Sequence, residues 1–219
     1  MQWLAGLSFG IATHLLFGWT VWQLFFFLRD GSRHTVAFSP AVDVLLCLQF
    51  AVLHSLLLWP PTARRLRRWI PGGLYGCLFS TVTCICLLTA IGLWAPSSDI
   101  IWQLTGLGRF LVLTGFYASW IALIYSMSLT GLGYQTGLTP WLYWVRGQPL
   151  PRRTFEPRSL YRWFRHPIYL SFLGLIWFCP TMTWDHAILT ATWTCYVFLG
   201  SYFKDRRLTY YLGDSYREY

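Results

Sequence analysis

Four long runs of apolar residues, separated by short polar stretches, occupy the first 130 residues of the chain. They cover approximately residues 3–28, 41–59, 74–94 and 109–129. Each run is close to the roughly 20 residues that cross the hydrocarbon core of a bilayer as an α-helix. Charged or helix-breaking residues follow the first two runs, at Arg29-Asp30-Gly31 and at Pro60-Pro61, where a helix is expected to end. The pattern predicts four transmembrane helices.

A shorter apolar pattern follows near the C-terminus. Residues 168–179 are strongly apolar, but this run is short for a full membrane crossing. Residues 180–185 carry turn signals, and residues 186–203 are largely apolar again. These features predict a short helical hairpin whose two ends lie side by side. The sequence therefore predicts an all-α integral membrane protein with about six membrane segments, of which the hairpin supplies the last two.

Composition and charge agree with this class. The chain is 55% hydrophobic and 11% charged, which leaves too few charges to solvate a globular surface. Of its 17 Lys and Arg residues, all but three lie in the loop after residue 59, in residues 130–165 or after residue 203; the exceptions are Arg29, Arg33 and Arg109. Basic loops tend to face the cytoplasm. We therefore expect a multi-pass protein with both termini in the cytoplasm, with Arg29 and Arg33 as a mild violation of the charge bias.

The net charge of +9 does not indicate a nucleic-acid partner. The basic residues flank apolar spans instead of forming a face of a soluble helix, and the basic, aromatic stretch 130–165 favours contact with anionic membrane lipids. The six cysteines lie in or beside apolar runs without the spacing of zinc ligands. We therefore expect no metal, and no feature of the sequence defines an oligomeric state.

Candidate site residues gather where the hairpin begins and where the chain leaves it. Arg165, His166 and Pro167 stand before the first hairpin helix, and Asp205 follows the second. In the tail, Asp205, Leu208, Leu212 and Tyr216 recur at intervals of 3, 4 and 4 residues, so a single helix would carry them on one face towards the hairpin. The simpler alternative is that Arg165 and His166 mark the membrane interface and that Pro167 begins a helix.

A second candidate lies in the second apolar run. His54 is about 8 Å of helical rise from Trp59 at the end of that run. It is therefore near enough to the basic side to face a cavity that opens there. A hydrogen bond between two helices is the alternative role.

Several of these segments resemble membrane methyltransferases related to isoprenylcysteine carboxyl methyltransferase. The matching segments are residues 165–169, 180–183, 205–208 and 213–219. Within this group the chain is most similar to the methanethiol S-methyltransferase branch, and nurim, a non-enzymatic nuclear-envelope protein, is a more distant relative. The resemblance covers about residues 131–219, with His54-Ser55 as weaker support. Two positions depart from the family pattern: Lys204-Asp205 replaces a common Glu-Glu pair, and Ser171 replaces a small Gly.

The resemblance implies that the protein binds S-adenosylmethionine. The implied binding residues are Arg165, His166, Pro167, Tyr169, Asp205, Leu208 and Tyr216. Arg165 and His166 would meet the carboxylate of this zwitterion and Asp205 its cationic end. Tyr169, Leu208 and Tyr216 would supply aromatic and apolar walls, and Pro167 would fix the start of the helix. On this basis residues 1–130 form the N-terminal transmembrane helices, and residues 131–219 form the loop, hairpin and tail that build a cytoplasm-facing cofactor site.

The resemblance also implies a thiol acceptor, with methanethiol, which would become dimethyl sulfide, as the expected substrate. A thiol is mostly protonated at neutral pH, so transfer to it needs a base or a positive field. His166, His54 and Arg165 are the candidates for this catalytic role, and the sequence does not rank them. A prenylated cysteine or another lipophilic acceptor is the alternative within enzymes, and a nurim-like structural protein is the alternative outside them.

Overall fold

The computed structural model describes residues 2–32, 34, 37–151 and 158–217. Arg33, Arg152 and Arg153, which were counted in the charge bias of the loops, lie outside the described residues. Four helices are long and apolar enough to cross a membrane, and they match the four predicted spans. They are α1 (Gln2–Asp30), α2 (Pro40–Leu58), α4 (Tyr75–Leu93) and α5 (Gly106–Leu129). The protein is therefore a multi-pass membrane protein.

The predicted hairpin is present as two helices of unequal length. The helix α8 (Pro167–Trp177) has 11 residues, and α9 (Trp184–Leu212) has 29. The first is too short to rank among the four candidate spans. The second continues without a break from its apolar half into the charged tail, so the tail residues 204–212 are part of the same helix as the second arm of the hairpin.

Proline and glycine set the ends of these helices. Pro40, Pro60 and Pro167 each stand at the first position of a helix, where the missing N–H removes no hydrogen bond. Gly213 ends α9 with φ 62° and ψ −136°, a conformation that is open almost only to glycine. The chain then turns into the short helix α10 (Asp214–Arg217).

A small sheet makes the all-α expectation incomplete. The strands β1 (Ile100–Gln103) and β2 (Thr181–Thr183) pair antiparallel and join the loop after α4 to the turn of the hairpin. Because the two strands are nearly 80 residues apart in sequence, no local pattern reveals their pairing. The ribbon fixes the turn of the hairpin against the preceding loop.

The stretch between α5 and α8 contains short helices, namely α6 (Leu132–Gln135), α7 (Leu138–Val145) and the 3-10 turn η2 (Ser159–Arg162). The helix α7 packs against α1 and α4, and the indole N–H of Trp141 donates to the carbonyl of Gly6 at 3.1 Å. A close backbone approach at Gly76 and Gly137 allows this docking, since a Cβ on Gly76 would lie 2.5 Å from Gly137 Cα. The predicted division of the chain into transmembrane helices (residues 1–130) and a cofactor-site region (residues 131–219) remains a prediction.

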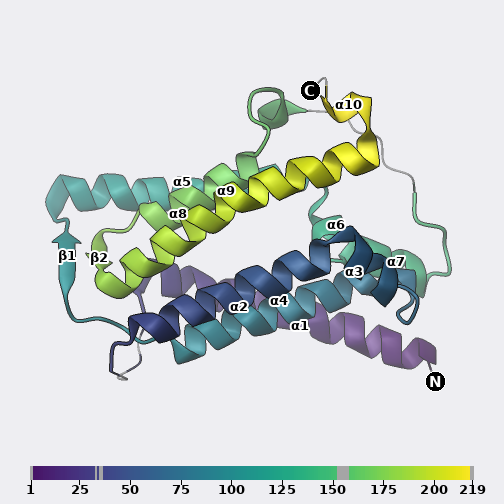
Figure 1. The fold of residues 1–219 in the computed structure, drawn as a ribbon, viewed down its shortest axis with the longest axis horizontal. Helices are drawn as coiled ribbons and strands as arrows, with labels where there is room; N and C mark the ends of the chain where they lie inside the picture. The colour runs from purple at the N-terminus through teal and green to yellow at the C-terminus, as the bar shows by residue number, and fades with distance from the viewer. Residues whose placement is uncertain (1, 33, 35–36, 152–157, 218–219) are drawn as a thin grey trace.

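The long helices form two layers (Figure 1). The helices α1, α2 and α4 pack together in one layer, and α5, α8 and α9 pack in the other, with contacts between α2 and α9 joining them. The core between them contains Leu28, Trp94, Phe116, Leu175 and Leu189. One end of the bundle carries β1 and β2, and we call it the strand end. The opposite end carries α3 (Pro60–Leu66), η1 (Gly72–Leu74), α7 and α10, and we call it the arginine end.

Candidate functional site

The start of the hairpin and the end of α9 meet at the arginine end. His166 Nε2 donates to a carboxylate oxygen of Asp205 at 3.2 Å, and the hydroxyl of Tyr216 donates to Asp205 Oδ1. Three predicted site residues therefore form one hydrogen-bonded cluster: Asp205 of α9, Tyr216 of α10, and His166, which precedes α8. We call His166, Asp205 and Tyr216 the His–Asp–Tyr cluster. The predicted convergence of the hairpin with the tail is confirmed.

The route by which Tyr216 reaches Asp205 differs from the predicted one. The expectation of one helical face for Asp205, Leu208, Leu212 and Tyr216 is wrong, because α9 ends at Leu212 and Tyr216 belongs to α10. The left-handed turn at Gly213 redirects the chain so that Tyr216 folds back onto Asp205. Its side chain is almost fully buried, with 3% of its surface exposed.

Aromatic and cationic side chains hold the histidine ring. Tyr169 stacks on His166 with ring centroids 5.4 Å apart and planes at 25°. The ammonium of Lys204 lies 5.0 Å from the centroid of the Tyr169 ring, within the range of a cation–π contact. Burial, reinforced by the charge of Arg207, lowers the pKa of Lys204 to about 8. Lys204, which departs from the family pattern, is therefore a packed member of the site.

The surroundings of His166 favour its neutral form. Burial lowers its pKa below the ordinary value, the charges of Lys204 and Arg165 add to that effect, and the hydrogen bond and charge of Asp205 oppose it. A neutral imidazole carries one proton, and the contact with Asp205 places that proton on Nε2. The other nitrogen, Nδ1, is buried and has no hydrogen-bond partner within the described part of the chain.

The other predicted residues occupy different positions around this cluster. Arg165 is exposed and acts on His166 through its charge, and Leu208 is half-buried on α9. His54 lies at the interface of α2 with α9, where its Nδ1 pairs with the hydroxyl of Tyr196 at 2.9 Å. Its ring packs against Phe50 and Phe79. The helix–helix hydrogen bond considered for His54 is therefore present.

Two residues that the sequence did not single out also face this region. Tyr196 bonds His54 and also lies 3.1 Å from the hydroxyl of Ser55. Arg207 acts electrostatically on His54, Tyr169 and Tyr196, and it makes no ion pair within the described residues. The available signals were its helical spacing from Tyr196 and Lys204 on α9 and its place in the segment 205–208, which carries part of the resemblance.

Ser171, which stands where the family pattern has a small Gly, fits into α8 without disturbing its neighbours. Its hydroxyl donates to the backbone carbonyl of Pro167 at 2.9 Å, one turn earlier in α8, and the side chain is buried. A buried hydroxyl that bonds its own helix needs no other partner. Ser171 therefore leaves the His–Asp–Tyr cluster unchanged.

A hollow of about 180 Å³ lies between α8 and α9 beside the cluster. It is lined by His166, Tyr169, Leu170, Leu173, Val197, Phe198 and Ser201. The exposed side chains of Leu170 and Phe198 flank it. Ligand pockets for drug-sized molecules begin at about 300 Å³, so this hollow suits a small apolar molecule.

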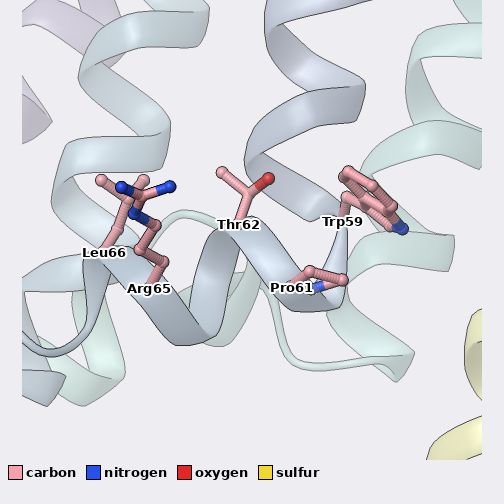
Figure 2. A pocket seen from close by; sticks show the side chains of 5 residues that line it. All are labelled: Trp59, Pro61, Thr62, Arg65 and Leu66. Atoms are coloured by element: carbon pink, nitrogen blue, oxygen red, sulfur yellow. The ribbon is translucent and has the colours of Figure 1, made fainter.

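A second and larger hollow lies at the corner between α2 and α3 (Figure 2). It measures about 300 Å³ and is lined by Trp59, Pro61, Thr62, Arg65 and Leu66. It contains none of the predicted site residues. Nearby, Arg64 of α3 donates to the hydroxyl of Tyr210 on α9 at 3.0 Å, so α3 and the end of α9 lie next to each other at the arginine end.

The fold and the cluster together define a multi-pass helical membrane protein with a half-buried, titratable cluster at one end of its bundle. A Mycobacterium tuberculosis protein named methanethiol S-methyltransferase is 30% identical over 180 residues, which cover 81% of this chain and 73% of that protein. The chain therefore belongs to the methanethiol S-methyltransferase family.

Further relatives extend over most of the chain. A methanethiol S-methyltransferase from Pseudomonas sp. is 26% identical over 99% of this chain and 87% of its own length. Nurim from Danio rerio is 26% identical over 79% of this chain and 65% of its own length. No family model matches the chain, and no solved structure matches it.

Proposed function

We propose that this protein transfers the methyl group of S-adenosylmethionine to methanethiol and releases dimethyl sulfide. The family relationship supports the reaction, since relatives named for it match most of the chain. The observation that carries the assignment of the site is the contact of Asp205 with His166 and Tyr216. This contact brings together the two segments, 39 residues apart, that the resemblance implicates.

The side chains around the cluster fit the chemistry of the cofactor. When bound, S-adenosylmethionine supplies an electrophilic methyl group on a sulfonium. Its carboxylate needs cations, which Arg165 and Arg207 offer at this end of the bundle, and Tyr169 offers an aromatic surface for the adenine. Asp205 supplies the negative charge, and with Tyr216 it keeps His166 oriented. Pro167 and Leu208 complete the proposed set as a helix start and an apolar wall.

The hollow between α8 and α9 supports a small acceptor. Its volume of about 180 Å³ accommodates a small thiol but is below the size typical for a ligand as large as the cofactor. It is also flanked by exposed apolar side chains, and a lipophilic thiol could lie along them. Methylation of a prenylated cysteine is therefore the second candidate, and a competition panel of methanethiol against a farnesylcysteine analogue distinguishes the two.

We also propose that α8 and α9 complete six membrane segments and that the arginine end faces the cytoplasm. Arg64, Arg65, Arg67 and Arg68 lie at that end, and basic loops favour the cytoplasmic side. The recess of Figure 2, with Arg65 and Thr62 on one side of α3, suits the headgroups of anionic lipids. Labelling of single cysteines from each side of the membrane tests this orientation.

The direct experiment uses the full chain purified in detergent. Calorimetry should detect binding of S-adenosylmethionine, and gas chromatography should detect dimethyl sulfide after addition of methanethiol. A nurim-like structural protein would neither bind the cofactor nor form the product. A well-folded preparation without cofactor binding would contradict the proposal.

A further inference from the structure

We propose that His166 accepts the proton of the thiol at Nδ1, with Asp205 as the positioning residue that keeps Nδ1 free for this role. This inference rests on the proposed methyl transfer to a thiol and assigns the base that the sequence left open among three candidates. It commits His166 to contact with the acceptor, and it gives His54 a packing role.

The hydrogen bonds of His166 determine which of its nitrogens can act. Asp205 accepts from Nε2 at 3.2 Å, and a carboxylate holds the proton of a neutral imidazole on the nitrogen that faces it. The lone pair is then on Nδ1, which is buried and unpartnered in the described part of the chain. In the corresponding contact of His54, Nδ1 is already engaged by Tyr196. Of the three candidates from the sequence, His166 is therefore the one whose ring is oriented by a carboxylate and whose other nitrogen is buried without a partner in the described part of the chain.

The proton transfer balances without a further reactant. The S–H bond of the thiol breaks and its proton moves to Nδ1, while the sulfur lone pair forms the new S–C bond to the methyl group. The bond between that methyl group and the sulfonium breaks, and its electron pair stays on the departing thioether sulfur. The imidazolium that remains on His166 is stabilised by Asp205 and returns its proton to solvent before the next cycle.

The charged and titratable groups around His166 are balanced for this task. They are Arg165 before α8, Tyr169 on α8, Lys204 and Asp205 on α9, and Tyr216 on α10 through Asp205. The two cations disfavour the imidazolium and keep the ring neutral before the reaction, whereas Asp205 favours the imidazolium once the proton arrives. Tyr169 stacks on the ring and limits its rotation.

The hollow between α8 and α9 gives a small thiol a place next to this base. His166 borders it together with apolar side chains from both helices. Because Nδ1 itself has almost no exposed surface without a ligand, the thiol reaches it only when the side chains around the ring shift. An apolar wall suits the alkyl part of a thiol but offers no other proton acceptor of comparable basicity, because its further polar groups are the hydroxyls of Tyr169 and Ser201. The ring of His166 is thus the acceptor that the chemistry of the hollow supports.

The decisive experiment compares a thiol with a selenol acceptor in the parent and in His166→Gln. Glutamine retains an N–H donor at the position of Nε2 and can still bond Asp205, but it has no basic nitrogen. A selenol is ionised at neutral pH and needs no base. At saturating cofactor, we expect His166→Gln to lower kcat with methanethiol by about 10²–10⁴-fold and to change kcat with methaneselenol by less than about threefold. His34→Gln, an exposed loop position, is the matched control.

Different outcomes separate this inference from the proposed function. A parent protein that binds no cofactor contradicts the proposed function itself. An active parent whose His166→Gln variant loses thiol and selenol turnover in the same proportion contradicts the role of base. The parent alone gives a second test that does not depend on the folding of a variant. Its kcat/KM for the thiol should fall as the pH drops through the pKa of His166, which burial lowers from the ordinary value of a histidine. The kcat/KM for the selenol should stay level down to the pH at which the selenol itself becomes protonated.

A pH profile tests the positioning role of Asp205. Since Asp205 raises the pKa of His166, Asp205→Asn should move the acidic limb of the thiol reaction to lower pH while lowering its plateau. A purely structural role would lower the plateau and leave the limb in place.

Discussion

The two ends of the helix bundle hold carboxylates in different surroundings. At the strand end, Asp185 is 4% exposed and accepts from the indole N–H of Trp94 and the backbone N–H of Ser97, each at 3.0 Å. Asp43 is fully buried and accepts from the backbone N–H of Ala95 at 3.0 Å. At the arginine end, the side chain of Asp205 is 34% exposed, and its partners are the titratable side chains of His166 and Tyr216.

This difference indicates what each end does. Backbone and indole N–H groups do not titrate in the physiological range, so Asp43 and Asp185 connect the loop after α4 to the starts of α2 and α9 through donors that keep their protons. The partners of Asp205 can exchange protons, and they lie beside a hollow. A carboxylate is therefore buried against donors that do not titrate at one end of the molecule, and it is half-buried among titratable partners at the other.

The largest expected effect is on stability at the strand end. Asp185→Ala leaves the indole N–H of Trp94 and the N–H of Ser97 buried without an acceptor. Each unsatisfied donor costs about 1–3 kcal/mol, so the variant should unfold at a markedly lower temperature than the parent in the same detergent. Thermal unfolding of the ligand-free protein measures this, and an unchanged midpoint would show that the carboxylate does not hold the loop.

Asp205→Asn should show the opposite pattern. Asparagine has nearly the same shape, and the site is open enough for water to reach it, so the midpoint of unfolding without ligand should match the parent. The charge-assisted hydrogen bond to His166 is worth about 1.5–3 kcal/mol, which corresponds to about 10- to 150-fold in turnover. Equal activity in this variant and in the parent would remove Asp205 from the site.

Much of this molecule could be predicted from the sequence because its main signals are local. The four long spans depend on runs of apolar residues, and the meeting of His166 with Asp205 follows from a hairpin whose arms return to the same side. The C-terminal end of α2 follows from Pro60, and the start of α8 follows from Pro167. The effect of a proline on a helix does not depend on distant contacts.

The parts that the sequence analysis missed depend on contacts between distant residues. No local pattern in the sequence reveals the pairing of β1 with β2. The same holds for the hydrogen bonds that Asp43 and Asp185 accept from the loop after α4. The tail was predicted as one helical face because the spacing of its apolar residues continues past Gly213, and glycine conformation was not weighed against that spacing. The position of Lys204 over Tyr169 also required the structure, since the sequence showed only a charge reversal.

Gly213→Ala tests how the tail contributes to the reactive end. An alanine at φ 62° and ψ −136° costs about 1–3 kcal/mol in backbone strain, which should displace α10 and separate Tyr216 from Asp205. We expect turnover to fall by roughly 5- to 150-fold while the strand end keeps its stability. Tyr216→Phe, which removes only the hydroxyl, should cause part of the same loss. A normal rate in both variants would exclude α10 from the site.

The smallest effect concerns Lys204, whose charge opposes protonation of His166 from the neighbouring position to Asp205. Lys204→Met removes that charge and keeps the apolar length of the side chain, so the pKa of His166 should rise, and the acidic limb of thiol turnover should move to higher pH. Because the pKa of Lys204 is about 8, its charge is present throughout that limb and is lost above it. The rates of variant and parent should therefore converge at alkaline pH, with plateau values within about threefold, as expected for a partly screened charge. The shift is opposite in sign to the one expected for Asp205→Asn. A pH–rate profile in which both variants move the limb in the same direction would contradict the opposing roles of these two neighbours.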